Sequence, residues 1–241
     1  MVGVDELLLA TLVVASGGLI QGISGVGSGF IMVPLLAIID FRFLPGALIF
    51  GSLSISGLMA WLDRQHIQFK DTPVVLIAIV PGALVGSWLL SIVATDQLGL
   101  FFGAMILLAV VITAFGVRLL PNLLNSTVAG LVAGAMGASS GIGAPIIALL
   151  YQHQAGPALR STLAYLYTIA STLIVFALAV FGQFGLEQVA LGCMLFPGFL
   201  LGLFLSRNFV LRVDQGLTRV LVLVVASISA LSLIVSSLWV I

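Results

Sequence analysis

The stretch GISGVGSG at residues 22–29 interrupts an apolar segment that runs from residue 6 to residue 39. A second interruption, GAMGASSGIGAP at residues 134–145, lies within an apolar segment over residues 123–151. A membrane-spanning helix needs roughly 20 apolar residues, so each segment is too long for one span. At about 1.5 Å per residue, we expect each flank to be too short to cross alone. Each segment is therefore predicted to form either one broken helix that crosses or a re-entrant hairpin.

The composition around these stretches is that of a membrane protein. Of the 241 residues, 61% are hydrophobic and 7% are charged, and the mean hydropathy is +1.34. Soluble domains average about 25% charged residues. Eight Lys and Arg balance eight Asp and Glu, which gives no basic patch for a nucleic-acid partner. Asp5 and Glu6 stand where a cleaved signal peptide is basic. We therefore expect one transmembrane domain over residues 1–241 that keeps its first apolar segment.

The distribution of basic residues distinguishes the broken helix from the hairpin, because cytoplasmic loops are enriched in Lys and Arg. Besides the two interrupted segments, six apolar segments have the length of a span: 44–62, 73–93, 97–117, 158–181, 187–206 and 215–239. If the interrupted segments cross, the basic residues divide 3 against 5. If they are re-entrant, the division is 7 against 1, with only Arg42 on the far side. We adopt six spans, two hairpins and periplasmic termini.

The two halves of the chain also repeat each other. Gly18, Gly22, Gly25 and Gly29 recur 112 positions later as Gly130, Gly134, Gly137 and Gly141. Each half then consists of one hairpin and three crossings, and an odd number of crossings makes the halves antiparallel. The predicted fold is an all-α membrane protein of two inverted repeats, over about 6–118 and 122–241. Each repeat is a re-entrant helical hairpin followed by three transmembrane helices.

The hairpins are the strongest candidates for a binding site. Irregular backbone inside the hydrocarbon is tolerated only beside protein or a water-filled cavity. A half-helix that begins near the midplane points its free N–H groups inward, and such an N-terminus attracts anions. The expected donors are Ser24, Gly25, Gly27, Ser28, Gly29, Ser139, Ser140, Gly141, Ile142 and Gly143. Alternatively, the glycines allow close helix packing, which we expect for Gly18–Gly22 and Gly130–Gly134.

Other polar side chains give weaker indications. Gln152, His153 and Arg160 cluster after the second hairpin and either line a cytoplasmic vestibule or anchor the chain. Gln21, Tyr165 and Tyr167 either line a cavity or pack. The spans carry no central carboxylate, the usual mark of proton coupling, which fits anion efflux down an inside-negative potential. No metal cluster, cofactor motif or catalytic constellation is present in the sequence. Cys193 and Trp88 are expected to be buried.

The two glycine motifs resemble those of the sulfite exporter TauE/SafE family. That family opens each half with a stretch similar to G-x-x-x-G-x-x-G-x-G-G-G and has a proline soon after. Here the first copy spans Gly18 to Gly29 and is followed by Pro34. The second ends at Pro145, where the family often has Gly-Gly-Pro, and Ser28 and Ala144 depart from the commonest pattern. The resemblance covers essentially the whole chain. It implies export of sulfite or small organosulfonates across the bacterial inner membrane, through the same glycine-rich residues.

We therefore expect a transporter, not an enzyme, that exports a small anion by alternating access. The expected partners are the small anionic substrate and the lipid bilayer, and the sequence leaves a homodimer open. An anion-selective channel with hourglass-like half-helices is the main alternative, although the Asn-Pro-Ala tips of aquaporin-like channels are missing. A membrane enzyme would lack catalytic groups. A purely structural membrane partner would leave the two interruptions unexplained.

Overall fold

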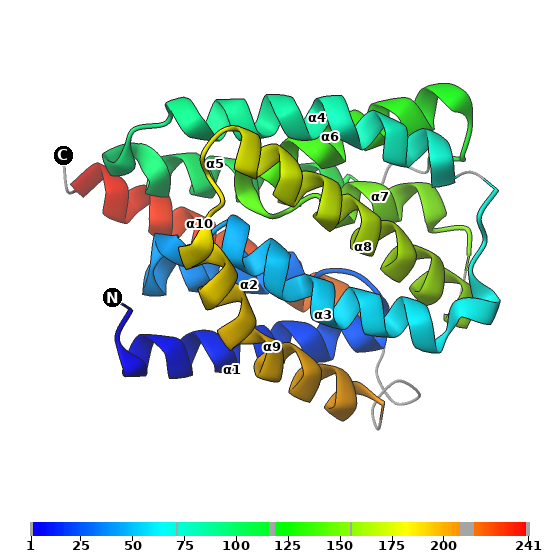
Figure 1. The fold of residues 1–241 in the computed structure, drawn as a ribbon, viewed down its shortest axis with the longest axis horizontal. Coiled ribbons are helices and arrows are strands. Elements are labelled where there is room, and N and C mark those ends of the chain that lie inside the picture. Colours follow the sequence, from blue (N-terminus) through cyan, green and yellow to red (C-terminus); the bar gives the residue numbers. More distant parts are fainter. Residues whose placement is uncertain (1, 71, 116–118, 155, 208–214, 240–241) are drawn as a thin grey trace.

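The computed structural model describes residues 2–70, 72–115, 119–154, 156–207 and 215–239, the last segment with side chains from 222 to 238 only. These residues form α-helices joined by short loops and three 3-10 turns (Figure 1). The α-helices are α1 (Val4–Ser24), α2 (Ser28–Ile39), α3 (Gly46–Leu62), α4 (Thr72–Ile92), α5 (Leu98–Ala114), α6 (Leu123–Ser140), α7 (Ala144–Tyr151), α8 (Gly156–Val180), α9 (Leu186–Ser206) and α10 (Gln215–Trp239). The predicted all-helical fold is confirmed for the described residues.

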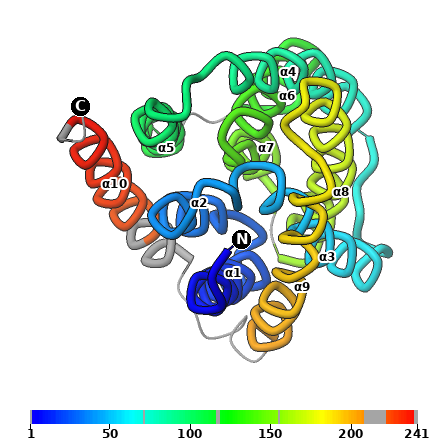
Figure 2. Tube along the Cα trace, turned by 60° about the vertical axis from the view of Figure 1, so that its left-hand side comes forward, coloured from blue at the N-terminus to red at the C-terminus, as the bar shows by residue number. Residues whose placement is uncertain are grey.

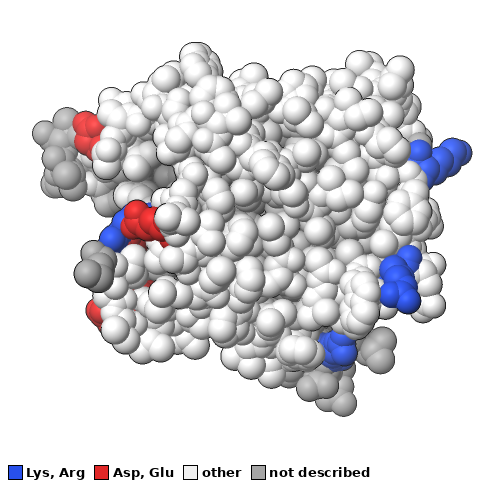
Figure 3. Space-filling model, viewed as in Figure 1, with Lys and Arg blue, Asp and Glu red and all other residues white. Residues whose placement is uncertain are grey.

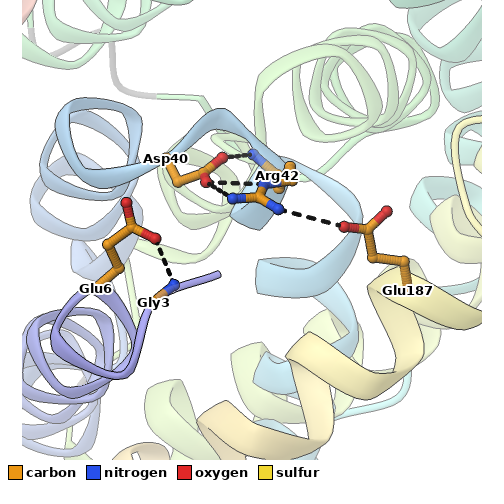
Figure 4. A network of polar contacts seen from close by, with 5 residues as sticks. All are labelled: Gly3, Glu6, Asp40, Arg42 and Glu187. Atoms are coloured by element: carbon orange, nitrogen blue, oxygen red, sulfur yellow. Dashed lines mark hydrogen bonds and ion pairs between the residues drawn. The ribbon is translucent and has the colours of Figure 1, made fainter. Parts of the chain in front are cut away.

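The first interrupted segment is a hairpin of α1 and α2. Its start and its end lie near each other, where the Gly3 N–H donates to Glu6 while Asp40 and Glu187 flank Arg42 (Figure 4). Since Gly3 precedes α1 and Asp40 follows α2, the chain leaves and returns to the same end of the molecule. Figure 1 shows α6 and α7 forming the corresponding hairpin from the opposite end.

Charge divides the molecule along its long axis. On the face drawn in Figure 3, Lys and Arg lie at one end, and Asp and Glu lie at the other with one cation among them. The basic end carries the α3–α4 connection, the end of α9 and the start of α8, with Arg64, Lys70, Arg160 and Arg207. The acidic end carries the start of α1 and the end of α10. Arg118, Arg212 and the side chain of Arg219 lie outside the described residues.

The two arms of each hairpin differ in length. The long arms are α1 with 21 residues and α6 with 18, or about 31 Å and 27 Å at 1.5 Å per residue. The return arms are α2 with 12 residues and α7 with 8. The prediction that every flank is too short to cross is wrong for α1, which is one of five helices in the described part of the chain that are long and apolar enough to span a membrane. The α1 helix continues through Gly18 and Gly22 to Ser24 without a break.

The long arms are fixed by glycine-mediated packing against helices of the other half, α1 on α9 and α6 on α4. A Cβ atom added at Gly18 would lie 2.9 Å from the carbonyl oxygen of Phe199, and one at Gly130 would lie 2.5 Å from that of Val75. At Gly202 it would lie 2.2 Å from the carbonyl oxygen of Ala15. The helices approach so closely only because these side chains are absent. The packing role predicted for the glycines at 18, 22, 130 and 134 is confirmed.

Large apolar side chains also cover the outer surface. Trp88 on α4 is 51% exposed and Cys193 on α9 is exposed, so the prediction that both are buried is wrong. Helices surrounded by lipid are apolar on both faces, and apolarity therefore does not separate the core from the lipid-facing side.

Candidate functional site

The two hairpin tips turn on glycines with positive φ. Gly25 (φ 76°) ends α1, Gly27 (φ 93°) precedes α2, and Gly141 (φ 83°) ends α6. This conformation costs glycine little, because it has no Cβ atom. The glycines that end the long arms, Gly25 and Gly141, are 116 positions apart rather than the 112 that the sequence pattern gave. The second break therefore comes one helical turn later than predicted, because Gly137 lies inside α6.

The short arms begin near the middle of the molecule. The 12 residues of α2 extend about 18 Å inward from the acidic end, and the 8 residues of α7 extend about 12 Å from the basic end. Together these lengths equal the roughly 30 Å thickness of the hydrocarbon core. The N-termini of α2 and α7 thus approach each other inside the molecule. A Cβ atom added at Gly29 would lie 3.5 Å from the carbonyl oxygen of Gly141.

A cavity of about 80 Å³ lies between these two N-termini. It is larger than the roughly 10–15 Å³ that one buried water requires. Residues from α1, α2, α3, α4, α6, α7 and α8 surround it: Gln21, Ser28, Gly29, Met32, Leu48, Ile49, Ser52, Ile79, Ala133, Gly137, Gly141, Ile142, Gly143, Ala144, Pro145, Ile147, Tyr167, Ala170, Ser171 and Ile174. We call it the central cavity. Five predicted donors line it, namely Ser28, Gly29, Gly141, Ile142 and Gly143.

The backbone supplies donors at this cavity. The first N–H groups of a helix have no partner within that helix, which applies to Ser28 and Gly29 of α2 and to Ala144 of α7. Farther along, the N–H of Phe30 donates to the Gly27 carbonyl and that of Ile146 to the Gly143 carbonyl. Pro145 has no N–H. The start of α2 therefore offers more backbone donors than the start of α7.

Gln21 adds a side chain that the predicted donor set did not include. It is 5% exposed, lies in the last turn of α1 and lines the central cavity. The Ser28 hydroxyl donates to its Oε1 atom at 2.7 Å. Tyr167 of α8 also reaches the cavity and donates to the Ala144 carbonyl at 3.1 Å. Gln21 could have been identified from the sequence, because it is a glutamine inside an otherwise apolar segment. Burying its amide is energetically unfavourable unless the amide has a polar partner.

The remaining predicted donors lie away from the central cavity. The Ser24 hydroxyl bonds to the Ile20 carbonyl at 2.8 Å and accepts from the Val26 N–H at 3.2 Å. Ser139 and Ser140 form the last turn of α6, and both hydroxyls donate to the Met136 carbonyl, at 3.4 Å and 2.7 Å. A helix C-terminus presents carbonyl groups rather than N–H groups. The structure thus places these two serines on the acceptor side of the break.

A second cavity of about 200 Å³ lies beside the first hairpin tip, toward the basic end. Its lining is mostly aliphatic and comprises Ile20, Ser24, Val26, Gly27, Phe30, Thr113, Pro145, Ala148, Leu149, Gln152, Leu159, Val222 and Leu223. Pro145 lines both cavities. Of the predicted vestibule residues, Gln152 lines this second cavity and Arg160 packs on Gly25, where an added Cβ atom would lie 3.2 Å from its Cγ. His153 instead bonds through Nδ1 to the Leu150 carbonyl at 3.1 Å.

The acidic end carries the ion pairs of the described chain. Arg42 donates to the Asp40 carboxylate through Nε at 2.8 Å, and its guanidinium lies 3.9 Å from Glu187 (Figure 4). Partial burial raises the pKa of Asp40, but the hydrogen bonds and positive charge of Arg42 outweigh this effect and hold the pKa below its ordinary value. The ionised pair therefore fastens the end of α2.

Among the described residues, no group of three or more His, Cys, Asp or Glu side chains could hold a metal ion. Comparison with models of protein families matches residues 9–233 to the family described as Sulfite exporter TauE/SafE. Searches of curated proteins and of solved structures found no match to the chain.

Proposed function

The chain belongs to the sulfite exporter TauE/SafE family, and we propose that it exports sulfite or a small organosulfonate across the bacterial inner membrane by alternating access. The anion binds in the central cavity between the N-termini of α2 and α7. Membership of a membrane-transporter family and the apolar helices support the general function. The substrate, the site and the mechanism are the proposed parts.

The observation that carries the proposal is the convergence of two helix N-termini on one internal cavity. Each aligned N-terminus carries a partial positive charge and favours an anion by typically 0.3–1 kcal/mol when exposed, and by more when partly buried. Glycine at position 29 places no side chain in front of the donors, where an added Cβ atom would already lie 3.5 Å from the Gly141 carbonyl oxygen. No Asp or Glu lines the cavity, so the lining holds no negatively charged side chain.

The helix pairings support inverted repeats and a rocking motion. Exchanging the halves converts the α1–α9 packing into α6–α4, α3–α9 into α8–α4, and α2–α10 into α7–α5. The α3–α8 and α5–α10 pairs convert into themselves. Such exchange is expected for two repeats that lie upside down around a shared site and move against each other.

The charge asymmetry supports the orientation. The basic end faces the cytoplasm by the positive-inside rule, so both termini are periplasmic and the second cavity is a cytoplasmic vestibule with Gln152 and Arg160 nearby. Efflux of a monoanion then gains about 2.3 kcal/mol per 100 mV of inside-negative potential. Reporters fused after Asp96 and Glu187 should score periplasmic, and one in the 64–70 loop cytoplasmic. The same side for all three would reject this orientation.

Purified protein in liposomes tests the function. Liposomes loaded with sulfite should release it faster than protein-free liposomes, with a rate that saturates with concentration. External unlabelled sulfite should accelerate exchange of labelled sulfite by counterflow. A protein-dependent flux that neither saturates nor shows counterflow would identify the anion-selective channel instead. Absence of any protein-dependent anion flux would reject both functions.

A further inference from the structure

We propose that the central cavity selects singly charged oxyanions over doubly charged ones, and that the Gln21 amide is its side-chain donor. The inference rests on the proposed function and specifies its substrate class. It assigns the transported form of sulfite to hydrogen sulfite, and it favours a simple sulfonate over a sulfonate that also carries a carboxylate.

The charges around the cavity support this selectivity. Each helix N-terminus is equivalent to roughly half a positive charge, so α2 and α7 together offer at most about one unit. The carbonyl ends of α1 and α6, which lie at the same two tips, offset part of it. The cavity lining contains no Lys, Arg, His, Asp or Glu from any of the seven helices that form it. The one titratable side chain in the lining is the Tyr167 phenol, which donates to the Ala144 carbonyl. A dianion would keep at least about one unit of negative charge without compensation.

An uncompensated charge is expensive at this depth. Moving an isolated ion out of water into a low-dielectric interior is strongly unfavourable, and the cost rises with the square of the charge. Two dipoles and neutral amide or hydroxyl donors balance a monoanion but not a dianion. The cavity of about 80 Å³ also restricts the ligand to a small headgroup.

Gln21 is placed to complete this donor set. Its Oε1 atom accepts the Ser28 hydroxyl at 2.7 Å, which turns the amide nitrogen away from Ser28. No described group accepts a hydrogen bond from that nitrogen, although the side chain is 95% buried and lines the cavity. An oxyanion in the cavity would supply the missing acceptor. A neutral amide donates without adding a full charge, which preserves the preference for monoanions.

Three anions separate the charge states. Methanesulfonate carries one charge, and sulfoacetate carries two near neutral pH. Sulfite loses its last proton near neutral pH and so changes from one charge to two. In proteoliposomes we expect faster efflux of methanesulfonate than of sulfoacetate. The sulfite rate, at constant total sulfite below saturation, should fall about tenfold per pH unit on the alkaline side, where the monoanion becomes scarce. The methanesulfonate rate should stay constant.

Two controls isolate the substrate's titration. Protein-free liposomes measure passive leakage of the neutral acid. The His66→Gln, His153→Gln double variant removes the two histidines, which lie outside the cavity lining; it should retain the wild-type sulfite profile. A sulfite rate that holds or rises at alkaline pH, or sulfoacetate efflux equal to that of methanesulfonate, would overturn the selectivity while leaving export intact. Absence of efflux for all three anions would instead reject the proposed function.

Gln21 is tested with the pH-independent substrate. Gln21→Leu removes the donor and should raise the KM for methanesulfonate about tenfold or more, the loss expected for a hydrogen bond to a charged group. Gln21→Glu keeps an oxygen for Ser28 and adds a negative charge, and it should abolish efflux at neutral pH. Gln97→Leu, in an exposed turn, is the matched control and should behave as wild type. Folded Gln21 variants with an unchanged KM would remove Gln21 from the site.

Discussion

The first hairpin reaches Gly25 and begins its return arm at Ser28, whose hydroxyl is held by Gln21. The second reaches Gly141 and begins its return arm with Ala144 and Pro145, which has no N–H to donate. Both hairpins turn on glycine and both place a helix N-terminus on the central cavity. The two hairpins differ in their hydrogen-bond donors. The Gln21 side chain and most of the backbone N–H groups at the cavity belong to the first hairpin.

The comparison separates two uses of the same residue type. Gly29 in the first hairpin has room for a methyl group, since an added Cβ atom would lie at ordinary contact distance, 3.5 Å from its nearest neighbour. Gly143 in the second is enclosed, and an added Cβ atom would lie 2.3 Å from the Ala133 carbonyl oxygen. We infer that Gly29 makes room for the ligand and that Gly143 makes room for the neighbouring helix.

The largest effect is expected from Gly29→Leu. The leucine side chain would enter the central cavity from the start of α2 and occupy the space in front of the donors, so sulfite efflux should fall to the rate of protein-free liposomes. Gly57→Leu is the matched control, because a Cβ atom there meets only Thr168, at 3.9 Å. Both variants should insert and melt normally. Near wild-type efflux in a folded Gly29→Leu variant would contradict the site.

The second hairpin should respond through stability instead. Gly143→Ala forces a methyl group against the backbone of α6, and overpacking of this kind costs about 1–3 kcal/mol. Thermal unfolding in detergent should show a lowered midpoint for Gly143→Ala and an unchanged one for Gly29→Ala. Equal melting of the two variants would remove the distinction between the hairpins.

The sequence predicted the interruptions, the hairpins and the packing glycines, since each rests on local chemistry. It did not predict where the second helix ends. Gly137 and Gly141 look alike in sequence, yet Gly137 continues α6 and Gly141 ends it with positive φ. A glycine needed for close approach and one needed for a left-handed turn both lack a side chain, and only tertiary packing distinguishes them. The same ambiguity placed Ser139 and Ser140 among the donors.

Substituting one serine in each hairpin should have a smaller effect on transport and tests the same difference between the hairpins. Ser28→Ala removes the hydroxyl that orients Gln21 and lines the cavity, and the loss of one neutral hydrogen bond should raise the KM for sulfite about two- to tenfold. Ser140→Ala removes a hydroxyl that bonds only within α6 and should leave the KM unchanged. Efflux kinetics on both variants provide the test. A larger effect at Ser140 would move the site toward the second hairpin.

The smallest expected effect is on thermal stability and comes from the contacts that hold the outer ends of α2 and α7. The end of α2 is held by the Asp40–Arg42 ion pair, whereas Gln154, after α7, donates to Gln68 through a neutral amide contact at 3.0 Å. The folded-state pKa of Asp40 lies below the ordinary value of 3.8. The stabilisation is therefore present above that ordinary value and is lost as the pH falls through the folded-state pKa.

Asp40→Asn should consequently lower stability at neutral pH by no more than about 1 kcal/mol, because the pair is partly exposed to solvent. Under acid conditions that protonate the wild-type carboxyl, the variant and the wild type should melt alike. Gln154→Ala is the counterpart in the second hairpin, and its effect on melting should not depend on pH, since neither amide titrates. Thermal unfolding of the three proteins at neutral and acid pH measures the difference. A pH-independent deficit in Asp40→Asn would mean that Asp40 stabilises the hairpin end through packing and the backbone hydrogen bond to Arg42 rather than through its charge.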